Sequence, residues 1–161
     1  MPMRGSRPSP PRRLVFRAVF RAIGVAALAG LLAGAGPLSP YRVDGDRIEA
    51  SLTGEPGDPA RGRALVMDQH GSTCVLCHAG AVPGVGGTVG PSLAGVGGRL
   101  DVGQMRLRLV DAAVVNPETV MPRFYTVAGL TRVAAAYAGR PVLDAGQIED
   151  IVAFLATLTT P

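Results

Sequence analysis

Apolar residues recur at helical spacing in the last part of the chain, after Asp144. Five of them repeat every three or four positions, which places them on one face of a helix. These are Ile148, Ile151, Val152, Leu155 and Leu158. Asp144 is a suitable N-cap, because its carboxylate can accept hydrogen bonds from the free N–H groups of a first turn. The pattern predicts an amphipathic helix from Asp144 to about Leu158.

Two shorter helices are predicted upstream. Asp58 followed by Pro59 is a favourable helix start, because aspartate caps the first turn and proline fits within it. This helix is expected to run to about Gln69. Asp101 caps a second helix over 102–113, in which three apolar residues share one side. These are Val102, Met105 and Leu109.

Between these helices the chain is rich in glycine and proline, which predicts long loops. Residues 36–57 are expected to form an irregular N-terminal arm that can lie on a partner, and Gly80–Gly98 contains eight glycines. A loop over 116–122 and a longer excursion over 123–143 precede the last helix. The sequence has no internal repeat. The helical patterns and the loops between them predict an all-α fold with long loops and one domain over 58–161.

Residues 1–35 have the composition of a secretory signal peptide. Six arginines and no acidic residue occur in this segment, and an apolar stretch over 22–32 precedes the small residues Ala33-Gly34-Ala35. The apolar stretch is shorter than the roughly 20 residues that a stable membrane anchor needs. An uncleaved anchor is the alternative. Cleavage would start the mature protein near Gly36, in the periplasm and free of the membrane.

The formal charge of the whole chain is misleading about its partners. The net charge is +4, but six of the sixteen arginines lie in the leader. The other ten face twelve Asp and Glu residues, which gives the rest of the chain a net charge of −2. A nucleic-acid-binding domain would instead concentrate basic residues on one face. The composition therefore gives no support to a nucleic-acid partner.

The two cysteines of the chain, Cys74 and Cys77, are followed by His78 in the pattern C-x-x-C-H, the attachment sequence for c-type haem. The thiols lie about one helical turn apart and can each form a thioether, while the histidine can bind the iron. Zinc ligation would also need His70, yet zinc sites usually take ligands from two separated segments. A thioredoxin-like pair lacks its βαβ setting, and a disulfide across so short a loop would restrain little of the unfolded chain.

An iron bound by His78 needs a second axial ligand or keeps an open position. Met121 is the strongest candidate, because its proline-flanked loop can fold over the far face of the ring. Met67 precedes the haem motif too closely to reach that face, and Met105 lies on an apolar helix face, where core packing is expected. His70 is expected to be a solvated residue near a helix end. The alternative is a Met121 that packs on the haem edge beside water or an open iron.

The glycine-rich loop over 80–98 does not contain the phosphate-binding patterns G-K-[ST] or G-x-G-x-x-G. Glycine also allows the backbone to approach another group closely. We therefore expect this loop to wrap tightly against a flat ring.

Several motifs together resemble the class I cytochromes c and, more closely, the SoxX family, the small monohaem subunits of the SoxAX cytochromes of bacterial sulfur oxidation. The resemblance extends from about Asp58 to Leu158 and does not cover the N-terminal arm. It is carried by Gly62-Arg63-Ala64, Cys74–His78, Gly90–Gly97, Asn116–Pro122, Gly129–Val133 and Gln147–Leu155. The excursion from Phe124 to Pro141 is its most diagnostic piece, because short cytochromes c lack it.

The resemblance implies a small class I cytochrome c fold wrapped around one covalent haem c. It implies that His78 and Met121 are the axial ligands, and that the Pro91 carbonyl accepts the His78 N–H and fixes the imidazole tautomer. The first and last helices of such a fold cross. Here Gly62 would allow a close approach to the Phe154 face.

The resemblance also implies a role in the periplasm, as the electron-accepting subunit of a SoxAX-type L-cysteine S-thiosulfotransferase in thiosulfate oxidation. Its partners would be a SoxA-type cytochrome subunit, which carries the catalytic haem, and a downstream acceptor cytochrome. This chain would supply no catalytic residue, since no thiol remains once Cys74 and Cys77 are attached to haem. A free-standing soluble electron carrier is the alternative. A haem-based ligand sensor is a third reading and requires that Met121 not bind iron.

Three arginines, Arg123, Arg132 and Arg140, flank the predicted ligand loop. They could neutralise haem propionates or meet an acidic partner. An ordinary solvated face is the simpler explanation, because exposed charges contribute little by themselves.

Overall fold

The structure is a computed structural model, and it describes residues 38–161; the expected signal peptide over 1–35 lies outside them. The described residues form helices and loops without a strand, which confirms the all-α class. The α-helices are α2 (Pro59–Met67), α3 (Cys74–Cys77), α4 (Val96–Arg99), α5 (Val102–Asp111) and α6 (Ala145–Thr157). Two short 3-10 helices are η1 (Ala112–Val114) and η2 (Ala135–Tyr137). None of the described helices is long and apolar enough to cross a membrane.

The three predicted N-caps form as expected. Asp101 accepts the Gln104 N–H at 2.8 Å, and the Gln104 side chain accepts the Asp101 N–H at 3.1 Å. The same reciprocal pair forms between Asp144 and Gln147 at the start of α6. Asp58 accepts two N–H groups in the first turn of α2. Each cap satisfies donors that a helix start would otherwise leave unpaired, which is why the helices begin where the sequence predicts.

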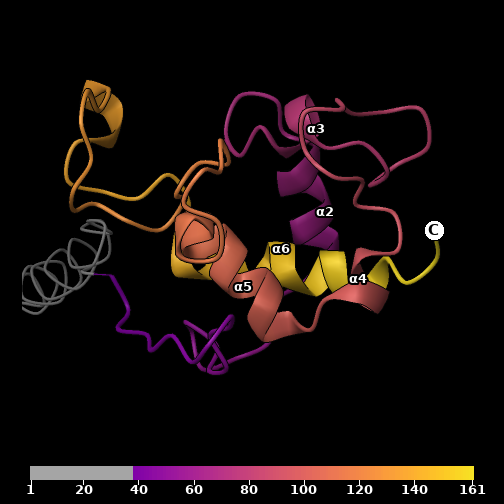
Figure 1. Cartoon of the computed structure of the whole chain (residues 1–161), viewed down its shortest axis with the longest axis horizontal. Coiled ribbons are helices and arrows are strands. Elements are labelled where there is room, and N and C mark those ends of the chain that lie inside the picture. The colour runs from indigo at the N-terminus through magenta and orange to yellow at the C-terminus, as the bar shows by residue number, and fades with distance from the viewer. Residues whose placement is uncertain (1–37) are drawn as a thin grey trace, which may run out of the picture. The chain divides into compact units, whose positions relative to one another are not determined.

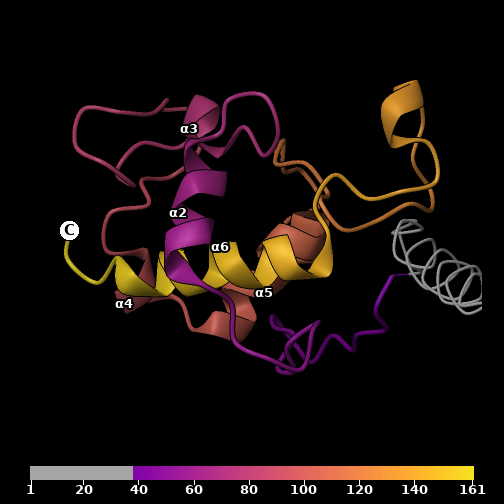
Figure 2. The same cartoon turned by 180° about the vertical axis from the view of Figure 1, so that it is seen from behind.

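Helices α2 and α6 cross, and their contact is the most extensive between any two described helices (Figure 1 and Figure 2). A Cβ atom built on Gly62 would overlap the Asp150 carbonyl and lie 2.9 Å from Phe154 Cβ. Only glycine therefore permits this crossing, which confirms the close approach predicted at Gly62. On α6, Ile148 and Ile151 are fully buried and form the centre of the core.

The segment before α2 is irregular but packs against the helices. Ile48 is fully buried and Leu52 is 6% exposed, so both belong to the core. The Ile48 N–H donates to the Gly103 carbonyl at 3.1 Å, and the Ser39 N–H donates to the Tyr125 hydroxyl at 2.8 Å. This arm therefore covers its own domain, and the described residues 38–161 form one compact unit.

A buried ion pair joins α5, α6 and this arm. Arg106 donates to both carboxylate oxygens of Glu149, at 2.7 and 2.9 Å, and the two side chains are only 5% and 4% exposed. Arg106 also donates to the carbonyl oxygens of Ile48 and Glu49, while Glu149 accepts the Leu52 N–H at 2.9 Å. The charges are thus buried with their hydrogen bonds satisfied, as burial of charge requires.

The long segment after the predicted ligand loop is irregular, apart from η2. It begins on α5, where the Phe124 N–H donates to Leu109 O at 3.2 Å and the Tyr125 N–H donates to Val110 O at 3.3 Å. It returns at Leu143, whose N–H donates to Phe124 O at 3.0 Å. Between these anchors the chain projects away from the helices (Figure 1 and Figure 2).

Candidate functional site

A cavity of about 800 Å³ lies among α3, α5, α6 and the loops around residues 90 and 120. All five predicted site residues line it: Cys74, Cys77, His78, Pro91 and Met121. They come from three segments that are far apart in the sequence, so the fold alone brings them together. Much of the remaining lining is aliphatic and includes Leu93, Leu109 and Leu155.

The two cysteines lie at the ends of α3, a single helical turn. The His78 N–H donates to the Cys74 carbonyl at 2.9 Å, which keeps the histidine directly beyond that turn. Both thiols are free and partly buried. Burial raises the pKa of the Cys74 thiol, which favours the protonated form.

The His78 imidazole is held by two neighbouring residues of the glycine-rich loop. Its Nδ1 lies 2.7 Å from the Pro91 carbonyl oxygen. Since a carbonyl can only accept, Nδ1 must carry the proton and Nε2 is left with a free lone pair for a metal. A Cβ atom on Gly90 would overlap the imidazole ring, so this backbone must be glycine to pass so closely.

Two further glycines bring the same loop against the haem motif. A Cβ atom on Gly86 would overlap the His78 carbonyl, and one on Gly87 would overlap the Leu76 carbonyl. The Gly90 N–H donates to Cys77 O at 2.8 Å. The loop thus wraps the backbone of the C-x-x-C-H segment and the His78 ring.

The predicted ligand loop is fixed by its own polar groups. The Thr119 hydroxyl accepts the Met121 N–H at 3.2 Å, and the Asn116 side chain accepts the Glu118 N–H at 3.1 Å. Thr119 N–H also donates to Asn116 O at 3.0 Å. These local bonds define the backbone of Met121, which is partly buried and lines the cavity. Thr119 was not singled out from the sequence, because a threonine two residues before a methionine carries no signal by itself.

A second sulfur also reaches the cavity. Met105 on α5 is 3% exposed and part of the core, as its apolar helix face predicts, yet it lines the cavity too. Met67 packs against the core and does not line the cavity. The side chain of His70 is 99% exposed, as expected for a solvated residue.

Two arginines that the sequence did not single out lie at the cavity, Arg99 and Arg108. Arg99 donates to the carbonyl oxygens of Ser92 and Ala94 and so braces the segment that follows Pro91. Arg108 donates to Gln104 O at 2.9 Å on its own helix. By contrast, the three arginines that flank the ligand loop do not line the cavity, and Arg123 pairs with Asp111 at 3.2 Å.

The residues present fit a covalently attached haem. The cavity combines two thiols, one imidazole nitrogen, methionine sulfur and an apolar lining, which suits a large flat apolar group with an axially bound iron. Among residues 38–161, no group of three or more His, Cys, Asp or Glu side chains is placed to hold a metal ion.

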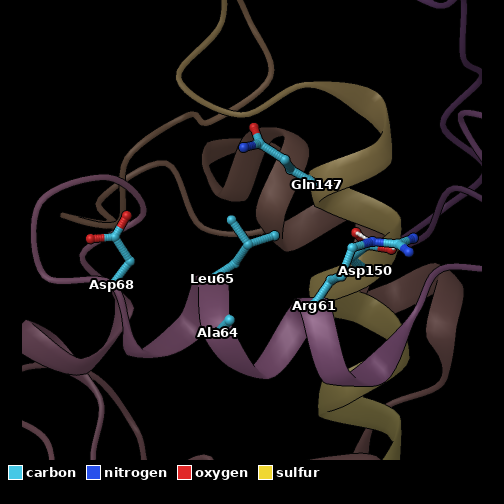
Figure 3. Close-up of a pocket in the computed structure, with 6 residues that line it drawn as sticks. All are labelled: Arg61, Ala64, Leu65, Asp68, Gln147 and Asp150. Carbon is cyan, nitrogen blue, oxygen red and sulfur yellow. Dashed lines mark hydrogen bonds and ion pairs between the residues drawn. The ribbon is translucent and has the colours of Figure 1, made fainter.

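A smaller open groove of about 430 Å³ lies between α2 and α6 (Figure 3). Arg61 and Asp150 lie side by side in it, and Arg61 donates to both carboxylate oxygens of Asp150 at 2.7 and 2.8 Å. Asp68, directly after the end of α2, accepts the His70 N–H at 2.9 Å. These groups are engaged in holding helix and loop ends, so the larger cavity is the better candidate site.

Comparison with known proteins gives one informative result. No family model matches the chain, and no curated protein matches it. Among solved structures, the crystal structure of SoxXA from P. pantotrophus shares 39% sequence identity with a TM-score of 0.68. The match covers 74% of this chain and 94% of that one. At this identity and coverage, the chain belongs to the SoxXA family of cytochromes.

Proposed function

We propose that this chain is a SoxX-type subunit, a periplasmic monohaem cytochrome c that accepts electrons in a SoxAX-type L-cysteine S-thiosulfotransferase. One observation carries the proposal: in a chain 39% identical to a SoxXA chain, Cys74, Cys77, His78 and Met121 line one largely aliphatic cavity. Its partners would be a SoxA-type cytochrome subunit and a downstream acceptor cytochrome. The signal peptide proposed for residues 1–35 would direct it to the periplasm.

The cysteine count favours the X subunit over the A subunit. The chain has two cysteines, and both belong to its single C-x-x-C-H motif. The family resemblance implies that a SoxA-type subunit ligates its catalytic haem iron through a modified cysteine, and it would therefore need a further cysteine. This chain has none to offer, so a role in electron transfer without substrate chemistry fits it better.

The chain's own residues would bind and orient the cofactor. Cys74 and Cys77 would form the two thioethers, and His78 and Met121 would be the axial ligands. Pro91 would keep the proton on His78 Nδ1, while Thr119 would fix the backbone of Met121. Haem c bound there would supply reversible one-electron redox chemistry. The aliphatic lining would exclude water, and two protein ligands would leave no exchangeable position.

The test is a haem-stained gel of the tagged full chain, expressed in its source organism and purified gently from the periplasm. We expect a covalent haem band near the mass of the mature chain, together with a second haem-stained subunit at fixed stoichiometry. A Cys74→Ala/Cys77→Ala variant should lose the first band.

Other results would contradict the proposal at different levels. A single haem band without a partner would indicate the free-standing carrier instead. Protein without haem stain would refute the cytochrome assignment altogether, and recovery in the cytoplasmic fraction would refute the periplasmic location.

A further inference from the structure

Within the longer segment over 123–143, residues 126–142 are called the excursion from here on. They are anchored at their base, but none of their side chains is fully buried. From Val127 to Arg140 every residue is exposed except Tyr137, which is partly buried. Both views show this segment reaching away from the helices (Figure 1 and Figure 2). Its base is closed by the hydrogen bond from Leu143 N–H to Phe124 O. The excursion therefore presents nearly all of its surface to whatever lies beside the domain.

Aliphatic side chains gather in the first half of the excursion. Val127, Leu130 and Val133 are 39%, 38% and 42% exposed. The excursion also contains five alanines, at positions 128, 134, 135, 136 and 138. Single exposed aliphatic residues are common on protein surfaces, whereas several that form one contiguous patch mark a surface that another molecule can cover. These three lie within seven residues of chain, so one partner surface could cover them together.

The charge of this part of the chain is opposite to that of the rest. Between Glu118 and Asp144 there are three arginines and no acidic residue. Elsewhere after residue 35, seven arginines face twelve acidic residues. Within residues 38–161, Arg123 is paired with Asp111, but Arg132 and Arg140 have no ion-pair partner. The excursion thus carries two cations without an acidic partner, although Arg140 Nε donates to the Ala136 carbonyl within the excursion. Arg132 is next to Val133 in the sequence and is the cation nearest to the aliphatic side chains along the chain.

Arg132 also adopts an unfavourable backbone conformation. Its φ is 58°, in the left-handed region, where glycine and asparagine are common and arginine is not. The fold makes no use of the Arg132 side chain within the described residues. A strained position that retains a long cationic side chain points to a role outside the domain.

We propose that the excursion is the docking element for the SoxA-type partner subunit, which covers it with a surface of acidic and apolar side chains. This inference rests on the proposed function for the identity of the partner. The excursion also begins five residues after Met121, in the same loop region as Val120, which lines the cavity and is 81% exposed. A partner that also covered the base of the excursion would therefore lie close to the proposed redox site.

The test measures the affinity of purified, haem-loaded full chain for the separately purified SoxA-type subunit of the same organism. A Val127→Ser/Leu130→Ser/Val133→Ser variant and an Arg132→Glu variant should each raise Kd at least about tenfold. High salt should weaken wild-type binding and shrink the effect of Arg132→Glu, because screening removes the charge attraction. The helical circular dichroism and haem spectrum of each variant should match those of the wild type, since the excursion lies outside the core.

Two matched controls remove the same chemistry elsewhere. Val102 is 47% exposed at the start of α5, and Arg63 is exposed on α2. Val102→Ser and Arg63→Glu should each change Kd less than about twofold. The proposal is overturned if the excursion variants bind as tightly as the wild type, or if the wild type does not bind the SoxA-type subunit. It is also overturned if the same variants instead abolish self-association or binding to anionic lipid vesicles.

Haem staining of the same preparations separates this inference from the proposed function. Haem-positive variants that bind normally would overturn the docking role alone. Haem-negative wild type would refute the proposed function, whatever its affinity for the partner.

Discussion

The imidazole of His78 is confined on two sides, by a hydrogen bond to Pro91 and by the bare backbone of Gly90. The first contact sets which nitrogen carries the proton, and the second sets how near the loop can come. Both contacts come from two adjacent positions of one loop, Gly90 and Pro91. Substitutions at these positions should therefore first change the position and protonation of the His78 ring.

Replacement of Gly90 by Ala should disturb the histidine directly. The added Cβ would overlap the His78 ring, so the loop or the ring must move at a cost of about 1–3 kcal/mol. We expect a lower midpoint in thermal denaturation and weaker haem retention. Gly146→Ala is the control, because a Cβ there meets nothing closer than 3.4 Å and alanine favours helix. Equal midpoints for the two variants would contradict this account.

The two methionines that line the cavity, Met105 and Met121, can be told apart by substitution. Met121→Ala should lower the reduction potential by a sizeable part of the roughly 0.8 V that axial ligands span, and should open the iron to added imidazole. Met105→Leu preserves volume in the core and should leave both properties unchanged. Potentiometric titration and the optical spectrum give the readout. An unchanged spectrum in Met121→Ala would remove Met121 as a ligand and favour a ligand sensor.

At the scale of elements, the N-terminal arm is fixed by one buried ion pair. Glu149 and Arg106 hold the backbone near Ile48 and Leu52, so this irregular segment is tied to α5 and α6. Nearby, Arg61 and Asp150 tie the start of α2 to α6, where the Asp58 N–H also donates to Asp150 at 2.6 Å. Two neighbouring acidic residues of α6 thus hold the two segments that precede the haem motif.

Removing one partner of the buried pair should be costly. In Arg106→Met, Glu149 would remain buried without its cation, which typically costs about 3–5 kcal/mol. Urea denaturation should show a large loss of the free energy of unfolding. Arg47→Met breaks an exposed pair with Asp101 and should cost less than about 1 kcal/mol. A loss in Arg106→Met no larger than in this control would show that the arm is held by other contacts.

Stability should depend on pH through Asp150. Hydrogen bonds from Arg61 lower the pKa of Asp150 below its ordinary value of 3.8. Its contribution is therefore present above pH 3.8 and lost as the pH falls through the lower, folded-state pKa. Asp150→Asn should be less stable than the wild type at neutral pH and should lose less stability below pH 3.8.

Denaturation at a series of pH values tests this dependence. Glu55→Gln, at an exposed site, is the control and should keep the acid dependence of the wild type. An Asp150→Asn curve parallel to that of the wild type would remove Asp150 as its source.

At the scale of the whole molecule, the cavity is large relative to the core around it. A large apolar group bound in a cavity of about 800 Å³ would add contacts that the surrounding helices cannot make with one another. The net stability of a typical domain is only about 5–15 kcal/mol, so the loss of these contacts would be a large fraction of it. The Cys74→Ala/Cys77→Ala variant without haem should therefore lose most of its helical circular dichroism. Retention of native circular dichroism and a cooperative melt would show that the helices support themselves.

The helices are more predictable from the sequence than the contacts between them. The caps at Asp58, Asp101 and Asp144 are local signals, so the helix starts were predictable from a few neighbouring residues. The Arg106–Glu149 pair could not be predicted, because its partners are 43 residues apart. In a sequence, a charged residue that will be buried looks the same as one that will be exposed. The arm's burial followed from that pair and was equally hidden.

The candidate site divides in the same way. Cys74, Cys77 and His78 announce themselves by spacing, and Met121 was chosen by its loop. The roles of Thr119 and Arg99 are visible only in the structure. Each side chain bonds a backbone group, the Met121 N–H or the Ser92 carbonyl, and every residue except proline has both groups, so the sequence gives no signal. Haem binding by Cys74, Cys77, His78 and Met121 stays a prediction that the substitutions above test.

The carboxylates of α6 reach back to segments that precede the C-x-x-C-H motif. Glu149 accepts the Leu52 N–H and Asp150 accepts the Asp58 N–H, across 97 and 92 residues of chain. Contacts of such separation close long loops and form late in folding. We therefore expect the arm and the start of α2 to be fixed only once α6 has docked, so that Cys74 and Cys77 lie in a part of the chain that completes its packing late.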